Sequence, residues 1–432
     1  MISTSINATT RTLADGHTQS KQVLLSCMIG NALEWYDFVI YGYFAVTFGA
    51  LFFPHVNHLS QILASWGIFW AGFLARPLGS IVFGHIGDRS GRKLALTLSI
   101  YAMAIPTMLM GCLPTYAQIG ILAPILLVTL RTLQGFAIGG EFTGSMIFLV
   151  EHAPETKRGV WGSWASFSAV MGVIAGSMIV TGLNTALSSE AMHNWGWRIP
   201  FILSIFGSVV GMYIRSYLTD PKVFLAAKSK QTKKSVPLKE LLHHHKSKIG
   251  TIILLDFLTA IGFFIVAIFL ATYFRTYLHF EHKIALSINT FNMCVFAVAI
   301  LLGGWLSDRI GRKATLGYPC MAFILFAYPL FQLLETGDMV TLLGVQAAFA
   351  VMMGVFFGTI PATLVEIMPT NVRFSGLSLA HNLSMAIFGG GTPFLATHLI
   401  QSSHNLASPA YLLIAASALS LSSLIFIKNK YL

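Results

Sequence analysis

Charged side chains are scarce in this sequence. Asp, Glu, Lys and Arg make up 10% of its 432 residues, while 55% are hydrophobic and the mean hydropathy is +0.72. A soluble domain carries about 25% charged residues, so this chain has too little polar surface to cover a water-soluble globule of its length. We therefore predict an integral membrane protein that lies in a lipid bilayer.

Cysteine is also rare, and the motifs of enzymes and of nucleic-acid-binding proteins are missing. The four cysteines lie in or beside apolar runs without Cys-x-x-Cys spacing, which excludes a disulfide framework or a cysteine metal site. No nucleophile motif or phosphate loop occurs, and we interpret the three histidines at 243–245 as a solvated loop. The net charge is +11, but basic and aromatic residues do not alternate on a polar surface. We expect no enzyme activity, no metal or cofactor, and no nucleic-acid partner.

The sequence is rich in long apolar runs. A helix needs about 20 mostly apolar residues to span a bilayer, and twelve such runs predict an all-α membrane protein with twelve transmembrane helices. A lysine-rich stretch separates six runs from six. We predict a tail at 1–21, a first six-helix half at 22–218, a linker at 219–247 and a second half at 248–432. The runs cover 22–52, 60–84, 94–113, 118–150, 160–187, 197–218, 249–277, 284–306, 314–334, 339–366, 374–400 and 409–428.

The basic residues predict the orientation of these helices. Lys and Arg are enriched on cytoplasmic loops, and 22 of the 27 fall in the two tails, the linker and the loops on the same side. We expect a multi-pass protein of the bacterial inner membrane with both termini in the cytoplasm. Residues 1–20 are polar and contain no apolar signal-peptide core, so the first helix is expected to direct insertion.

Two motifs occur once in each half. Residues 84–93 (GHIGDRSGRK) return at 304–313 as GWLSDRIGRK, and the pattern Glu-x-x-Pro-x-x-x-Arg at 151–158 returns at 366–373. The two offsets, 220 and 215 residues, are nearly equal. Two matches in register predict pseudo-symmetric halves related by an axis along the membrane normal.

These motifs resemble those of the major facilitator superfamily. Its loop signature, Gly-x-x-x-Asp-Arg-x-Gly-Arg-Lys, matches at residues 84–93 and again in the second half. Five further stretches resemble its metabolite:proton symporter branch, which includes bacterial proline/betaine, α-ketoglutarate and citrate permeases. The resemblance implies secondary active transport by alternating access with a proton as the coupling ion. The stretches are NALEWYDF (31–38), RPLG (76–79), RTLQGFAIGGEFTG (131–144), WGWRIPF (195–201) and IFGGGTP (387–393).

Acidic residues interrupt the first apolar run. An acid near the centre of a spanning helix costs roughly 2.5–3.5 kcal/mol, yet this run contains both Glu34 and Asp37. At the helical period these two residues share one stripe with Tyr41 and Asn31. Lipid cannot solvate such a stripe, so we expect it to face the interior of the bundle.

The fourth run carries a second polar stripe, which includes Arg131, Gln134 and Glu141. We expect the two stripes to meet across a wet cavity. Burial and a like-charged neighbour favour the protonated form of a carboxyl, so Asp37, Glu34 and Glu141 are the predicted proton-coupling residues. Arg131 is the predicted anchor for a substrate carboxylate, because its guanidinium can donate two parallel hydrogen bonds. The alternative is that these charges only lock helices together.

Polar residues of the second half complete the predicted substrate site. Asp256 follows Asp37 by 219 residues, so it is predicted at the symmetry-related position of the seventh helix. His381 belongs to a residue type that titrates near neutral pH, although a lone helical histidine is more often packed. The predicted substrate-binding residues are Arg131, Gln134, Tyr41, Asn31, Asp256, Asn382 and His381.

The repeated loop motif is predicted to control the conformation. Asp88 is expected to stabilise a helix N-terminus, where the helix dipole is positive. The family resemblance implies that this contact holds the cytoplasmic side closed in the outward-open state, and the alternative is a pure topology signal. The predicted gating residues are Gly84, Asp88, Arg89, Gly91, Arg92, Gly304, Asp308, Arg309, Gly311 and Arg312.

These expectations define one functional hypothesis and its rivals. We predict a monomeric transporter that takes up a small carboxylate-bearing metabolite together with a proton. The substrate is a zwitterion such as proline or betaine, or an organic acid such as α-ketoglutarate or citrate. The alternatives are an uncoupled facilitator of a similar solute and a membrane sensor that does not transport.

Overall fold

The computed structural model describes residues 24–55, 58–216, 220, 224–226, 241 and 243–427. Throughout these ranges the secondary structure is helical and contains no strand, which confirms the all-α prediction. Most of the predicted linker at 219–247 lies outside the described residues, as do the two tails, so the boundaries of the halves stay a prediction.

The first half contains one helix or broken helix for each of its six predicted runs. Residues 24–43 form the first helix, and a break at Phe44 separates it from α2 (Ala45–Phe52). Short elements connect the longer helices at the ends of the bundle. The longer helices are α3 (His58–Arg89), α4 (Arg92–Gly111), α6 (Leu122–His152), α7 (Arg158–Ala186) and α9 (Arg198–Ser216); the connectors are α5 (Tyr116–Ile119), η1 (Glu155–Lys157), α8 (Ser189–Ala191) and η2 (Met192–Gly196).

The second half repeats this plan, with π-helical turns inside two of its spans. The π-helical segment η3 (Ile265–Phe269) joins α12 (Lys246–Phe264) to α13 (Leu270–Thr276). Likewise η5 (Met385–Gly389) joins α17 (Arg373–Ser384) to α18 (Thr392–Ser403). The remaining elements are α14 (His282–Ile310), α15 (Arg312–Leu334), α16 (Met339–Ile367), η4 (Thr370–Val372), α19 (Ala410–Ser423) and η6 (Leu424–Phe426).

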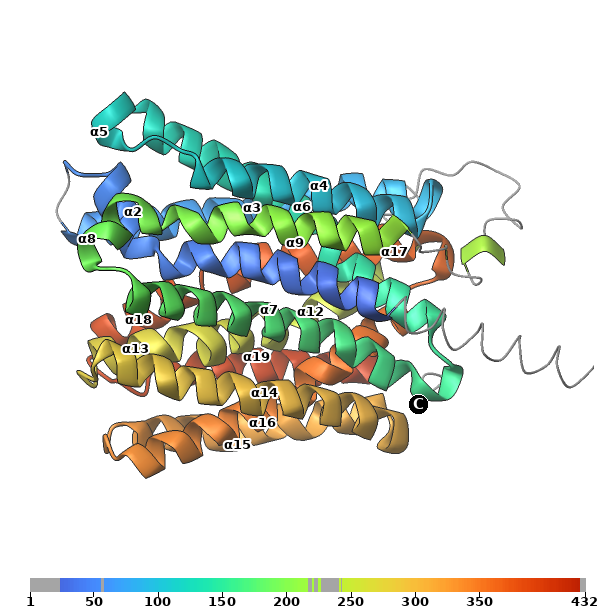
Figure 1. Cartoon of the computed structure of the whole chain (residues 1–432). Helices are drawn as coiled ribbons and strands as arrows, with labels where there is room; N and C mark the ends of the chain where they lie inside the picture. Colours follow the sequence, from blue (N-terminus) through green and yellow to red (C-terminus); the bar gives the residue numbers. More distant parts are fainter. Residues whose placement is uncertain are drawn as a thin grey trace, which may run out of the picture.

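The helices lie side by side in one elongated bundle (Figure 1). Within the described ranges, nine helices are long and apolar enough to cross a membrane, or ten if the bent pair formed by 189–196 and 198–213 is one span. The first helix and α19 complete the twelve predicted spans. We call the end of the bundle that carries the loop motifs at 89–93 and 309–313 the basic end; α17 begins there, to the right in Figure 1.

Glycines allow equivalent helices of each half to pack backbone to backbone. In the first half, a Cβ on Gly135 of α6 would lie 1.9 Å from the carbonyl oxygen of Gly72 in α3. In the second half, a Cβ on Gly358 of α16 would lie 2.0 Å from the carbonyl oxygen of Ile300 in α14. Small residues at such contacts supply the close packing that associates helices in lipid. The second and fourth spans of each half are therefore fixed against one another.

Gly135→Ala is expected to destabilise the first half, because the added methyl group would meet backbone that has no side chain to move aside. We expect a loss of at least about 1–3 kcal/mol, measured as a lower melting temperature in detergent. Gly182→Ala is the matched control, since a Cβ on this glycine inside α7 meets no atom within 4 Å. Equal melting temperatures for the two variants would contradict this account of the packing.

Candidate transport site

The acids of the two predicted stripes line one cavity inside the first half. It is bounded by the first helix, α4, α6 and α9. Glu34, Asp37 and Glu141 all line it, and each is at most 3% exposed. The hydroxyl of Ser99 donates a 2.5 Å hydrogen bond to Oε2 of Glu141. Carboxyls from the first helix and α6 thus meet as expected, and α4 contributes a hydroxyl to them.

Asp37 lies beside two hydroxyl groups and one arginine. Its Oδ1 atom is buried and has no hydrogen-bond partner among the described residues. The hydroxyls of Thr107 and Ser204 lie beside the carboxyl, and Arg131 is its cationic neighbour. A buried carboxylate without full hydrogen bonding is costly, so Oδ1 of Asp37 marks a position where a further hydrogen-bond partner can bind.

Arg131 lies in an aromatic enclosure and not in the acidic cavity. One guanidinium nitrogen donates to the side-chain oxygen of Gln134, and another donates to the carbonyl of Phe38 at 3.4 Å. The guanidinium carbon lies 4.1 Å, 4.6 Å and 5.0 Å from the ring centroids of Phe38, Tyr41 and Phe69. These contacts all come from the first half, so Arg131 ties α6 to the first helix and α3.

Two other predicted site residues of the first half contact their own half. Gln134 donates to the carbonyl of Asp37 at 3.3 Å and to the hydroxyl of Thr107 at 2.8 Å. Asn31 donates to the carbonyl of Ala165 in α7 at 3.2 Å. These hydrogen bonds join the first helix to α6 and α7, and α6 to α4. They give Gln134 and Asn31 protein partners without a ligand.

Arg76 of α3, which the predicted site did not include, lies where the two halves meet. Its Nε atom donates a 2.9 Å hydrogen bond to Oδ1 of Asn382 in α17, and Asn382 donates in turn to the carbonyl of Gly139 in α6 at 2.9 Å. Its acidic neighbours are Glu34 from the first half and Asp256 from the second. The Nη2 atom of Arg76 is buried without a hydrogen-bond partner in the described structure. The sequence signal was present, since Arg76 is one of the two arginines inside apolar runs.

Asp256 and His381 form a buried pair in the second half. Oδ2 of Asp256 on α12 lies 2.6 Å from Nδ1 of His381 on α17, and both side chains are at most 1% exposed. Asn382 follows His381 in sequence and binds Arg76, so three predicted substrate-binding residues converge on this guanidinium. Their convergence brings together residues that are far apart in the chain.

Aromatic rings from both halves surround this charged region. Trp35 of the first helix packs edge-on against Phe263 of α12 with centroids 5.0 Å apart. Phe142 of α6 lies 5.5 Å from the His381 ring and 6.2 Å from Phe357 of α16. Rings next to a guanidinium provide a surface that binds both apolar groups and cations.

The loop motif of the first half fastens the basic end to the second half. Both carboxylate oxygens of Asp88 accept backbone hydrogen bonds at the N-terminus of α17, at 3.0 Å from Phe374 and 2.8 Å from Ser375. Arg92 lies 2.5 Å from the same carboxylate. A negative charge at a helix N-terminus is stabilised by the helix dipole, and Asp88 has the helix-end position expected from the sequence.

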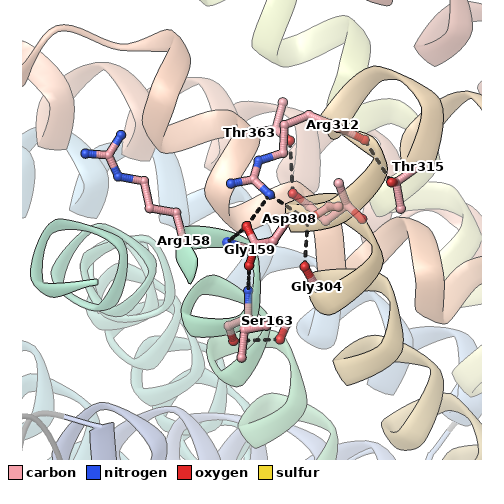
Figure 2. A network of polar contacts seen from close by, with 12 residues as sticks. Arg158, Gly159, Ser163, Gly304, Asp308, Arg312, Thr315 and Thr363 are labelled. Atoms are coloured by element: carbon pink, nitrogen blue, oxygen red, sulfur yellow. Dashed lines mark hydrogen bonds and ion pairs between the residues drawn. The ribbon is translucent and has the colours of Figure 1, made fainter. Parts of the chain in front are cut away.

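The motif of the second half makes the reciprocal contact. Asp308 accepts backbone hydrogen bonds from Gly159 at 2.7 Å and from Val160 at 2.8 Å, at the N-terminus of α7. Arg312 donates to Asp308 at 2.7 Å, and Figure 2 shows these residues beside Ser163 and Gly304 at the closely packed junction of α7 and α14. We call the Asp88 and Asp308 contacts the two latches.

Glutamates reinforce both latches. Glu151 lies 2.7 Å from Arg373 of the other half and 3.4 Å from Arg92. Glu366 lies 3.3 Å from Arg312 and 4.0 Å from Arg158 of the other half. The two repeated motifs found in the sequence therefore form one network at each latch, in which carboxylates and guanidiniums alternate.

The remaining motif residues shape the backbone or lie at the surface. Gly91 and Gly311 have φ angles of +142° and +89°, which side chains rarely adopt. Gly84 and Gly304 sit against Ser375 and Ser163 of the opposite half. Two exposed arginines make local contacts: Arg89 lies 3.5 Å from His85, and Arg309 lies over the ring of Trp305.

The structure has two similar six-helix halves that are latched reciprocally at one end and enclose buried charges between them. This architecture defines a multi-pass membrane transporter and not an enzyme. The model of the Major Facilitator Superfamily matches residues 27–393. The chain belongs to this superfamily, which confirms the fold predicted from its sequence.

Known relatives and solved structures agree with this assignment. The chain is 34% identical to the glycine betaine/proline/ectoine/pipecolic acid transporter OusA of Dickeya dadantii, over 95% of this chain and 83% of the relative. It is 34% identical to the proline/betaine transporter of Salmonella typhimurium, over 93% and 82%. Its fold matches that of the proton:xylose symporter XylE bound to 6-bromo-6-deoxy-D-glucose with a TM-score of 0.82, 14% identity and 95% coverage of both chains.

Asp88→Asn is expected to open the basic end, because an amide retains only one acceptor and loses the charge that the N-terminus of α17 stabilises. Spin labels are attached at Glu155→Cys and Ile310→Cys in a background without the four native cysteines. Double electron–electron resonance between them measures the separation of the halves. We expect the distance distribution to shift to longer values.

Asp338→Asn is the matched control for this variant. Asp338 caps the N-terminus of α16 by accepting from the backbone of Thr341 at 2.9 Å, but this contact lies within the second half at the other end of the bundle. An unchanged distribution in Asp88→Asn, or the same shift in both variants, would refute the latch.

Proposed function

We propose that this chain is a proton-coupled symporter for a small zwitterionic carboxylate of the proline/betaine class. It would work by alternating access across the bacterial inner membrane, as a monomer with both termini in the cytoplasm. The basic end is then the cytoplasmic end, and the latched arrangement is the state in which that end is closed. An organic acid such as α-ketoglutarate or citrate is the second candidate substrate.

The observation that carries this proposal is the position of Arg76. A substrate that is released on alternate sides must bind where the halves meet, and Arg76 contacts both halves there through Asn382 and its two acidic neighbours. Its unpartnered Nη2 atom is a buried donor that a substrate carboxylate would satisfy. Arg131, the anchor predicted from the sequence, also has one unpartnered nitrogen, Nε. Its contacts with Gln134 and three rings all lie within the first half, however, so it does not lie where the halves meet.

The aromatic rings favour the zwitterion over the organic acid. A substituted ammonium group binds the faces of aromatic rings. Phe73 lies 5.3 Å from the Arg76 guanidinium, and Phe142 lies 5.5 Å from the ring of His381. A second or third carboxylate would face Glu34 and Asp256 at the cost of like-charge repulsion. The names of the relatives in Dickeya and Salmonella, which specify betaine and proline, support the same class.

The acidic cavity supports coupling to protons. Three buried carboxyls line one cavity, so the same space offers three acceptors for a coupling proton. A membrane potential of about 100 mV and a pH gradient of one unit together supply about 3.7 kcal/mol per proton, enough for roughly 500-fold accumulation of a zwitterion.

Uptake into proteoliposomes tests the function directly. We expect accumulation of radiolabelled glycine betaine or proline against its gradient, abolished by a protonophore. Uptake of a zwitterion with one proton moves charge, so an imposed inside-negative potential should accelerate it, whereas a monoanion carried with one proton would show no such effect. Equilibration without accumulation would identify a facilitator, and no flux of any candidate would favour a sensor.

Arg76→Lys is expected to raise the KM for substrate at least about tenfold, because an ammonium cannot hold a carboxylate in the two-pronged geometry of a guanidinium. Arg131→Lys serves as the comparison, since it makes the same change at the other buried arginine. We expect it to lower thermal stability through lost ring contacts, with a smaller effect on KM. A larger increase in KM for Arg131→Lys than for Arg76→Lys would identify Arg131 as the anchor, as the sequence predicted.

Asp37→Asn and Glu34→Gln are expected to separate exchange from accumulation. Neither variant can release the proton at that position, so uphill uptake should fall by at least about tenfold. Exchange of labelled for unlabelled substrate needs no net proton movement and should persist. If both variants still accumulate substrate under a proton gradient, these two acids do not carry the coupling proton.

A further inference from the structure

The Asp256–His381 pair has features that a purely structural contact does not explain. It joins α12 to α17 at 2.6 Å, yet Oδ1 of Asp256 and Nε2 of His381 are both buried without a hydrogen-bond partner among the described residues. Each group can therefore form a further hydrogen bond that the closed arrangement leaves unmade. A polar pair selected only for stability is expected to be fully satisfied.

A charged residue of the first half, Arg76, faces this pair. Arg76 of α3 has both Asp256 and Glu34 as its acidic neighbours, and Glu141 lies on α6, which also packs against α17. The ring of Phe142, from α6 of the first half, lies 5.5 Å from the ring of His381. Arg76 is therefore the cation that faces both the pair and an acid of the proton cavity.

The other helices around the pair have their charges far from it. Within α12 and α17, the basic residues lie toward the basic end, more than two turns away. In α16 and α19 the titratable residues lie near the helix ends, and His398 lies in the middle of α18, 17 residues after His381. These residues are Lys246, Lys248, Arg373, Glu366, His398 and Tyr411.

Charge balance then links the pair to Arg76. With neutral His381 the pair carries one negative charge, which Arg76 neutralises. When the imidazole binds a proton, the pair becomes neutral as His⁺–Asp⁻. The positive charge of Arg76 is then compensated by Glu34. A buried charge must be compensated nearby, so each protonation of the pair shifts the preferred partner of Arg76 from the second half to the first.

We propose that Asp256 and His381 form a second proton-binding site, in the second half, and that Arg76 transmits its protonation state to the acids of the first half. This inference deepens the proposed function and rests on it for its role in transport. The nearby π-helical segments η3 and η5 interrupt the same two helices after Asp256 and His381. Such segments often accompany functional sites.

The test uses the full-length protein and needs no substrate. Spin labels at Glu155→Cys and Ile310→Cys report the separation of the halves between about pH 5 and pH 8, where histidine titrates. We expect a pH-dependent shift in the distance distribution of the otherwise native protein. In His381→Gln the amplitude of this shift should fall at least about threefold.

Two further variants keep the experiment decisive if His381→Gln is unstable. Asp256→Asn/His381→Gln replaces the pair by a hydrogen-bonded pair that cannot titrate, and it should show the same loss of pH dependence. Ser420→Ala is the control, since its hydroxyl donates to α12 at the carbonyl of Leu255 and carries no titrating group; its pH response should be unchanged.

Each result decides the inference separately from the proposed function. A native-like pH response in both pair variants, or no response in the parent protein, overturns the second proton site. Failure of the proposed function appears elsewhere, as an absence of protonophore-sensitive uptake of betaine and proline by the parent protein. A pH response that depends on the pair in a protein without such uptake would support the site and reject its role in transport.

Discussion

A charge buried in a membrane bundle must be compensated by the protein itself, because neither lipid nor bulk water reaches it. In this chain the compensation repeatedly crosses between the halves. Asp88 of α3 binds the N-terminus of α17, Asp308 of α14 binds the N-terminus of α7, and Arg76 binds Asn382. Separating the halves therefore exposes or unpairs charges at several depths at once. In any state with an open basic end these groups must have other partners. We therefore expect the bundle to have distinct conformations and not a continuous range of them.

The ends and the middle of the bundle differ in symmetry. The two latches are built alike, with an aspartate on a helix N-terminus, an arginine four residues later and a glutamate that joins arginines of both halves. The middle is not repeated: the first half contains an acidic cavity, while the second contains a single Asp–His pair. The contacts at the basic end thus follow the repeated fold, whereas the buried charges to which we assign substrate binding and coupling differ between the halves.

The sequence was sufficient to predict the structural features that depend on a local pattern of residues. Twelve apolar runs gave the spans, and the two loop motifs gave the latches, because a short motif retains its neighbours along the chain. The polar stripe of the first helix was recognised as interior, since 100° periodicity fixes which residues share a face. What the sequence did not reveal is which interior group faces which. Arg131 and Arg76 are both arginines inside apolar runs, so the sequence alone does not distinguish them. In the structure Arg76 contacts α17 of the other half, whereas Arg131 is enclosed by Phe38, Tyr41 and Phe69.

The enclosure of Arg131 also has a consequence for the acids. Its rings and Gln134 hold the guanidinium near Asp37, and no ion pair joins the two side chains in the described structure. Asp37 therefore has a cationic neighbour, while its Oδ1 atom has no hydrogen-bond partner among the described residues. An arginine held by aromatic rings leaves Oδ1 of Asp37 open to a further partner, which is the arrangement that our proposal of Asp37 as a proton-coupling residue requires.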